Sequence, residues 1–171
     1  MSNLLSRAKV SLNNARSNWQ NASLDDAYIN SACFQLQQSF EFALKFAVEL
    51  EGKTYIKNHD LRAQLNLLTN SKVSKGILNN IASKSEMYNK WEVESRYNDN
   101  FVALYSDVEE ALVLCDNLIK EVESLLPTCD LKSNAAITWC RNNAPEAFKN
   151  LTDDELWSQM KDMYVKYGNP I

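Results

Sequence analysis

The chain has 171 residues, of which 18 are Lys or Arg and 22 are Asp or Glu, giving a formal net charge of −4. This length suits one soluble domain whose core needs neither disulfides nor a metal, and the acidic balance argues against duplex DNA binding. Three Gly and three Pro are too few turn residues for a many-stranded β fold. No stretch approaches the roughly 18 apolar residues of a membrane span, and the polar start is unlike a signal peptide. A cytoplasmic protein without a membrane partner is therefore predicted.

The sequence indicates neither a metal site nor a bound cofactor. The four cysteines form no Cys-x-x-Cys pair, and the single histidine, His59, lies far from them along the chain, which argues against a zinc site or a disulfide framework. No Gly-x-Gly-x-x-Gly or Gly-Lys-Ser/Thr phosphate loop is present. A Ser-His-Asp triad would have to use His59, but a His beside Asp60 at a helix start is more typical of a cap.

Two helices are predicted in the first third of the chain. Apolar residues at alternating three- and four-residue steps predict a first helix that ends near Asn21. Ser23 and Asp26 resemble a capping box for a long helix over about residues 24–51, which Gly52 ends. This second helix is apolar around most of its circumference, so we expect it to lie at the centre of the molecule.

Three further helices follow. A short one begins after His59-Asp60, with caps supplied there or by Asn58, and a longer one spans about residues 73–91. The helical period is then lost over residues 89–105, which predicts an irregular loop of the kind that often carries function. Ser106 and Glu109 form a capping box for a helix that runs up to Pro127.

Residues 127–171 form a predicted C-terminal extension with two shorter helices. The first covers about residues 131–143, and the second begins with the capping residues Thr152 to Glu155. Each has too little apolar surface to fold alone, so we expect both to pack on the bundle or on a partner chain. The predicted fold is all-α: an antiparallel, up-and-down bundle of about five helices over residues 1–126, with two short C-terminal helices.

A polar stripe interrupts the apolar surface of the second helix. Gln37, Glu41 and Lys45 stand four residues apart and therefore share one face, with Gln38 beside them. One interpretation is a solvated edge that carries a Glu–Lys ion pair. The other is a stripe that faces a groove or a partner.

Four motifs follow one another in a particular order. They are Asp26-Ala27-Tyr28, the Gln-Gln-x-x-Glu-x-Ala-Leu-Lys core of residues 37–45, His59-Asp60-Leu61, and Ser95-Arg96-Tyr97-Asn98-Asp99. In this order and approximate spacing they resemble the prokaryotic HEPN domain, over about residues 1–126. The resemblance implies a helical bundle that forms a homodimer and is often encoded beside a minimal nucleotidyltransferase, as a toxin–antitoxin pair. Many members are metal-independent ribonucleases, in which an Arg is followed a few residues later by a His and two such sites face each other across the dimer.

The ribonuclease motif is incomplete in this chain. Arg96 matches its Arg, but Phe101, Val102 and Ala103 stand where the His is expected. RNA cleavage needs one group to take the 2′-hydroxyl proton and another to protonate the leaving oxygen, and His is best suited to this near neutral pH. We therefore expect little or no ribonuclease activity from the isolated protein. The chain is nearer the Ser-Arg-Tyr-Pro-Asp branch of the family, although Asn98 replaces its Pro.

The resemblance implies a functional groove in which an Arg orients a nucleotide, an RNA or the partner transferase. The candidate residues for it are Arg96, Tyr97, Asp99, Gln37, Glu41 and Lys45. The structural alternative for Arg96 is an ion pair with a nearby glutamate, at position 92, 94 or 41. Two functions stay open: an RNA-directed, toxin-like protein held with a nucleotidyltransferase, or a non-catalytic module that binds a nucleotide or joins an assembly. A small nucleotidyltransferase encoded next to the protein favours the first, and its absence favours the second.

Overall fold

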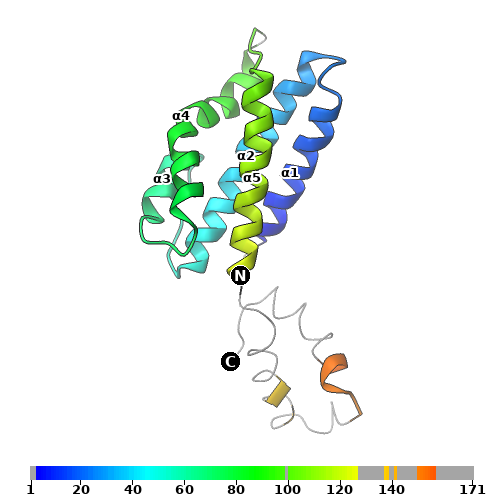
Figure 1. Cartoon of the computed structure of the whole chain (residues 1–171), viewed down its shortest axis with the longest axis vertical. Coiled ribbons are helices and arrows are strands. Elements are labelled where there is room, and N and C mark those ends of the chain that lie inside the picture. The colour runs from blue at the N-terminus through cyan, green and yellow to red at the C-terminus, as the bar shows by residue number, and fades with distance from the viewer. Residues whose placement is uncertain (1–2, 99, 127–136, 139–140, 142–149, 157–171) are drawn as a thin grey trace. The chain divides into compact units, whose positions relative to one another are not determined.

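The computed structural model describes residues 3–98, 100–126, 137–138, 141 and 150–156. The residues between Leu4 and Leu125 form one compact unit, and the C-terminal ones belong to a second. The first unit consists of five α-helices, which are drawn in Figure 1: α1 (Leu4–Gln20), α2 (Asp26–Leu50), α3 (Leu61–Leu67), α4 (Lys75–Tyr97) and α5 (Tyr105–Ser124). No residue of the described ranges is in a strand. The prediction of an all-α helical bundle is confirmed.

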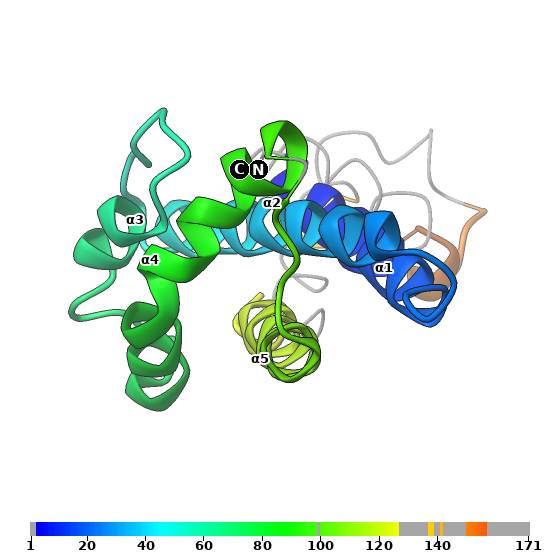
Figure 2. The ribbon, with the colours of Figure 1, turned by 90° about the horizontal axis from the view of Figure 1, so that it is seen from above.

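Helix α2 is the centre of the bundle, as its apolar circumference predicts. It contacts each of the other four helices. Figure 1 and Figure 2 show α1 running alongside α2, with α3 and α4 on the opposite side of α2 and α5 across another of its faces. Its buried side chains include Ile29, Leu36, Phe40 and Leu44. Burying such side chains contributes roughly 1.5–3 kcal/mol each relative to exposure, so α2 supplies much of the driving force for folding.

Two kinds of contact fix the other helices on α2. The ring of Phe40 stacks on Tyr88 of α4 with centroids 4.8 Å apart, and Tyr88 in turn packs against Trp91 at 5.0 Å. The buried hydroxyl of Ser39 donates to the carbonyl of Ala8 in α1 at 2.8 Å and lies 3.1 Å from the thiol of Cys115 in α5. Aromatic stacking thus joins α2 to α4, and a polar contact joins it to α1 and α5.

The helix ends agree with the sequence in some places and differ in others. Gly52 follows α2 with φ of +70°, a left-handed conformation that glycine adopts without strain. The N-cap of α2 is Asp25, whose carboxylate accepts from the N–H of Ala27, so the expected Ser23 cap is wrong. Helix α5 begins at Tyr105 without a side-chain cap, so the capping box at Ser106 is also wrong.

The earlier start of α5 has a visible cause in the packing of Tyr105. Its hydroxyl donates to the carbonyl of Ala22 at 3.0 Å, and its ring lies 5.2 Å from that of Trp19. Both contacts are made to the turn region between α1 and α2. They fix Tyr105 in the first helical turn and outweigh the weaker preference for a Ser cap at the next residue.

The predicted loop over residues 89–105 is wrong in its first half, because α4 continues to Tyr97. Beyond Trp91 the helix has no apolar stripe, which is why the hydrophobic period fails there. It is held by polar contacts instead: Arg96 pairs with Glu92 one turn earlier, and Asn98 bonds both the carbonyl and the carboxylate of Glu94. Only the part after α4 is non-helical, over residue 98 and residues 100–104.

The described residues of the second unit include one predicted cap. Thr152 and Glu155 form a reciprocal capping box, with Thr152 N–H donating to Oε2 of Glu155 at 2.8 Å and Glu155 N–H donating to Oγ1 of Thr152 at 3.3 Å. The rest of the helix predicted there, and most of the one predicted over residues 131–143, lie outside the described residues. None of the described helices has the length and apolarity needed to cross a bilayer.

Candidate functional site

The polar stripe of α2 is buried inside the protein. Gln37, Glu41 and Lys45 are all buried, and the ammonium of Lys45 lies 2.7 Å from Oε1 of Glu41. The Glu–Lys ion pair expected from the sequence is confirmed, but the interpretation as a solvated edge is wrong. The stripe faces the segment of residues 53–60, which connects α2 to α3: Gln37 donates to the backbone carbonyl of His59, and the ammonium of Lys45 lies 5.4 Å from the ring centre of Tyr55.

Buried amides hold that connecting segment in one conformation. Gln64 of α3 is fully buried, and its side chain bonds both the N–H of Ile56 at 3.1 Å and the carbonyl of Ile56 at 2.8 Å. From the other side, the amide of Gln37 donates to the carbonyl of His59 at 3.2 Å. Because buried polar groups need partners, these bonds explain why amides occupy core positions, and they fix the position of His59.

His59 extends the polar stripe toward the surface. Its Nδ1 lies 2.9 Å from Oε2 of Glu41, on the carboxylate oxygen opposite the one that binds Lys45, while its side chain is 61% exposed. His59 is therefore not the cap of α3. That role belongs to Asp60, whose carboxylate accepts from the N–H of Arg62 at 2.9 Å.

The last turn of α4 brings Arg96 to the same place. Its Nε donates to the carbonyl of Glu92 at 2.7 Å, and its Nη2 lies 3.1 Å from Oε1 of Glu92. The guanidinium carbon is 4.9 Å from the ring centre of Phe34 in α2 and 5.0 Å from that of Tyr97. The same oxygen of Glu92 is 3.9 Å from Nδ1 of His59.

These contacts form a continuous series of charged groups, which we call the polar network. In order it consists of Lys45, Glu41, His59, Glu92 and Arg96, with Gln37 bonded to the backbone of His59. It joins α2, the connecting segment and α4, and it passes from the buried Lys45 to the exposed end of α4. Basic and acidic side chains alternate along it, so each carboxylate lies between two basic side chains.

The structure places the predicted site residues in two groups. Gln37, Glu41 and Lys45 lie at the buried end of the polar network, and Arg96 lies at its exposed end with Tyr97 packed on it. Arg96 contacts Glu92 and not Glu41 or Gln37, so the two groups meet only through other residues. Asp99 lies outside the described residues.

His59 and Glu92 are the residues that link the two groups, and neither is among the six candidate groove residues, although the ion pair of Arg96 with Glu92, one of the three glutamates expected as its partner, is confirmed. A signal exists for Glu92, because it stands one helical turn before Arg96 and so shares its face. No local pattern shows that His59 lies on Glu41, since 18 residues separate them. Only the fold of the connecting segment brings them together.

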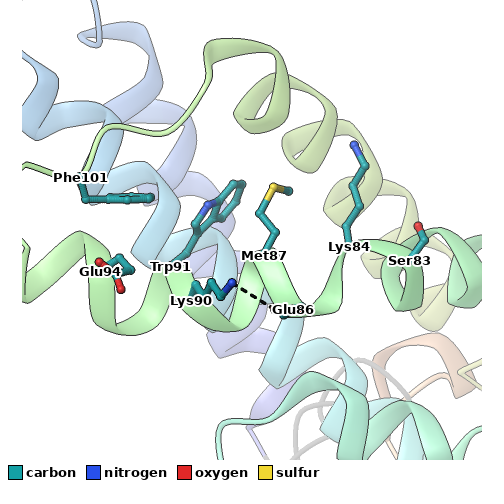
Figure 3. Close-up of a pocket in the computed structure, with 8 residues that line it drawn as sticks. All are labelled: Ser83, Lys84, Glu86, Met87, Lys90, Trp91, Glu94 and Phe101. Carbon is teal, nitrogen blue, oxygen red and sulfur yellow. Dashed lines mark ion pairs between the residues drawn. The ribbon is translucent and has the colours of Figure 1, made fainter.

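A concave surface lies on another face of α4. It is an open groove of about 670 Å³ between α4 and the residues before α5, with Met87, Trp91 and Phe101 pointing into it in Figure 3. Lys90 at its edge pairs with Glu86 at 3.1 Å, and Lys84 pairs with Glu110 of α5. None of the predicted site residues lines this groove, so the candidate site is the polar network. Among the described residues no three His, Cys, Asp or Glu are grouped so as to hold a metal ion.

Comparison with known proteins gives one family and one solved structure. The crystal structure of TT1696 from Thermus thermophilus is similar to this chain, with 26% sequence identity and a TM-score of 0.44, over 70% of this chain and 98% of that one. No curated protein matches. The family described as HEPN domain matches residues 1–125, which span all five helices of the first unit. The chain therefore belongs to the HEPN domain family.

Proposed function

We propose that this HEPN-domain protein binds phosphate groups of RNA or of a free nucleotide through Arg96, as the homodimeric partner of a minimal nucleotidyltransferase in a toxin–antitoxin or defence-type system. One observation carries the binding proposal. The Arg96 guanidinium is held in a fixed position at the surface by Glu92, Phe34 and Tyr97, and its side chain remains 38% exposed.

The contacts of Arg96 leave donors for a ligand. Nε and Nη2 each donate to Glu92, whereas Nη1 has no partner among the described residues. A guanidinium has five N–H donors in a planar fork that matches two phosphate oxygens. Because the flanking rings already order the side chain, less rotamer entropy is lost when it binds a phosphate. An exposed Tyr97 beside it offers a surface on which a base can stack.

The nucleotidyltransferase and the homodimer rest on membership of the family, for which the resemblance implies both. A binding module without such a partner is the alternative. Co-expression with a small nucleotidyltransferase encoded next to the protein is the direct test of the pairing. Co-purification of the two proteins in a fixed ratio supports the pairing, and the absence of such a neighbour, or separate elution of the two proteins, leaves only the binding module.

Phosphate binding is tested by the fluorescence anisotropy of a labelled single-stranded RNA of mixed sequence, with unlabelled ATP as a competitor. We expect Arg96→Ala to weaken binding by about tenfold or more and Arg96→Lys to be intermediate, since Lys keeps the charge but loses the fork. Competition by ATP at concentrations similar to RNA identifies a nucleotide site, and competition only at much higher concentrations identifies an RNA site.

Arg16→Ala is the matched control for this experiment. Arg16 lies on α1, is 45% exposed and pairs with Asp116 of α5, so it resembles Arg96 in exposure and in having a carboxylate partner. Its removal should leave RNA and nucleotide binding unchanged. Equal losses in the two variants, or no loss for Arg96→Ala, would show that Arg96 is only a structural residue.

A further inference from the structure

We infer that Arg7 binds a second phosphate of the ligand that Arg96 holds, and that this ligand is a single strand of nucleic acid, DNA as well as RNA, and not a free nucleotide. The inference rests on the proposed function, because it needs a phosphate at Arg96. It adds a binding site on α1 that none of the sequence motifs includes, and it decides between the two ligands proposed above.

Arg7 has no polar partner within the described part of the chain. The chain has five arginines, and the other four each form a hydrogen bond or an ion pair: Arg16, Arg62, Arg96 and Arg141. Arg7 is exposed, and its guanidinium carbon lies 3.9 Å from the centre of the Phe42 ring. This contact orders the side chain and leaves all of its N–H donors for a ligand. An ordered arginine loses less rotamer entropy when it binds a phosphate.

The groove beside Arg7 carries no negative charge on the described residues that line it. It lies between α1 and α2, has a volume of about 350 Å³, and is lined by no Asp or Glu. Helix α1 contains three basic residues and no acidic one. The other two, Lys9 and Arg16, pair with Glu123 and Asp116 of α5. The charge of Arg7 is the one that no described carboxylate compensates, so it attracts an anion to the groove.

The ring of Phe34 joins this groove to Arg96. It lines the groove, and its centre lies 4.9 Å from the guanidinium carbon of Arg96. Phe34 and Phe42 therefore each carry an arginine, and they belong to one row of α2 in which Gln38 lies between them. Along a helix their positions are about 12 Å apart. The surface of this row thus has one arginine at each end.

This spacing favours a strand over a free nucleotide. Successive nucleotides of a stacked strand lie about 3.4 Å apart, so about 12 Å corresponds to roughly three or four nucleotides. The phosphates of one nucleotide are adjacent and can reach one arginine only. Val10 of α1, which is 56% exposed, lines the same groove as Phe34, and together they offer the bases an apolar surface.

The contacts of this surface do not depend on the sugar. An arginine on a phosphate and a ring beneath a base make no contact with the 2′-hydroxyl, which is the group that lets proteins distinguish RNA from DNA. We therefore expect a DNA strand to bind as well as an RNA strand of the same length.

The test measures the fluorescence anisotropy of labelled DNA and RNA strands of about eight nucleotides with the full chain, and uses unlabelled ATP as a competitor. The variant is Arg7→Met, which keeps an unbranched side chain on Phe42 but removes the charge. We expect it to weaken binding of both strands by about fivefold or more at low salt. The slope of log affinity against log salt should fall by about 0.7, since one phosphate contact is lost. The inhibition constant of ATP, which reaches Arg96 alone, should be unchanged.

Arg16→Met is the matched control, because it changes the same residue type on the same helix where Asp116 already pairs with the charge. It should leave both the affinity and the salt slope unchanged. Equal changes in the two variants, or an unchanged slope for Arg7→Met, overturn the second phosphate site. Binding of RNA without binding of DNA, or an equal loss of ATP affinity in Arg7→Met, overturns the assignment of the ligand.

Two further outcomes distinguish this second site from the proposed function. Competition by poly-glutamate at concentrations similar to those of the DNA strand would show that the groove takes an acidic peptide, and overturns the assignment to nucleic acid. Failure of the wild-type protein to bind any strand, or unchanged binding by Arg96→Ala, overturns the proposed function itself. Binding that depends on Arg96 but not on Arg7 overturns the second site alone.

Discussion

Lys45 and Glu41 form an ion pair inside the bundle, with Nζ 2.7 Å from Oε1 and both side chains buried. One helical turn separates the two residues on α2, and the connecting segment contacts both, Glu41 through His59 and Lys45 through the ring of Tyr55. Removing two charges from water costs several kcal/mol per ion, and their attraction offsets that cost only while both are present. Removing one of the two charged side chains should therefore lower the stability of the fold more than removing both.

The first prediction concerns this pair. Lys45→Met leaves the carboxylate of Glu41 buried with only His59 and Gln37 nearby, so we expect it to lower the free energy of unfolding by about 3–5 kcal/mol. Urea unfolding followed by circular dichroism measures the loss. The control is Lys90→Met, which removes an exposed ion pair of the same spacing with Glu86 and should cost less than about 1 kcal/mol. Similar losses in both variants would contradict the burial argument.

The helices follow from the sequence because each has an apolar face that must be buried. The apolar circumference of α2 predicts its central position, and Gly52 marks its end. Where polar contacts hold a helix, the periodicity fails. The last turn of α4 is held by Arg96 on Glu92 and by Asn98 on Glu94, so it was expected to be a loop. The spacing of apolar residues along the sequence does not reveal such polar contacts.

The candidate site is harder to predict, because it depends on contacts between distant segments. The spacing of Gln37, Glu41 and Lys45 predicts a shared face but not whether that face is buried. Burial is decided by the connecting segment, which the amide of Gln64 holds through both backbone groups of Ile56. His59 reaches Glu41 only as a result, so no motif search along the chain would pair them.

The second prediction uses two glycines as a matched pair. Gly52 has φ of +70°, where a side chain is strained, so Gly52→Ala should destabilise the protein by about 1 kcal/mol although nothing crowds its Cβ. Gly76 lies in the first turn of α4, exposed and also uncrowded, so Gly76→Ala should stabilise by about 0.5–1 kcal/mol. Urea unfolding gives both values. We expect the two substitutions to change the free energy of unfolding in opposite directions. Changes in the same direction would contradict the backbone conformations of the two glycines.

The third prediction concerns the two buried thiols. Burial raises the pKa of Cys33 and that of Cys115 to about 12, from an ordinary value of about 9. Between these values the folded state keeps both protons and the unfolded state releases them, so the free energy of unfolding falls as pH rises above about 9. At about pH 10 the loss is about 1 kcal/mol per thiol relative to about pH 8.

The control for this pH dependence is the variant with both Cys33→Ala and Cys115→Ala. Burial also raises the pKa of Tyr88, whose contribution has the same sign and remains in the variant. We therefore expect the decrease in unfolding free energy between about pH 8 and pH 10 to be about 2–3 kcal/mol smaller in the variant than in the wild-type protein. An identical decrease in both would show that the thiols are not protonated in the folded state at about pH 10.

The last prediction concerns the homodimer. Five of the ten large apolar side chains that are exposed among the described residues lie in one stretch around the end of α4 and the start of α5: Val93, Tyr97, Val102, Leu104 and Tyr105. Apolar groups left in water at one place favour association, and the stretch includes the neighbours of Arg96, where the resemblance places the dimer contact. We therefore expect static light scattering at micromolar concentration to give about twice the mass of one chain.

Two valine substitutions, one inside this apolar stretch and one outside it, test whether the stretch forms the dimer contact. Val93→Asp, at a residue 52% exposed on α4, should give the mass of one chain, because a carboxylate in an apolar contact is costly to desolvate. Val113→Asp, at a residue 61% exposed on α5 and outside the stretch, should leave the dimer intact. A dimer that survives Val93→Asp and dissociates with Val113→Asp would place the contact on α5. A single-chain mass for the wild-type protein would contradict the homodimer.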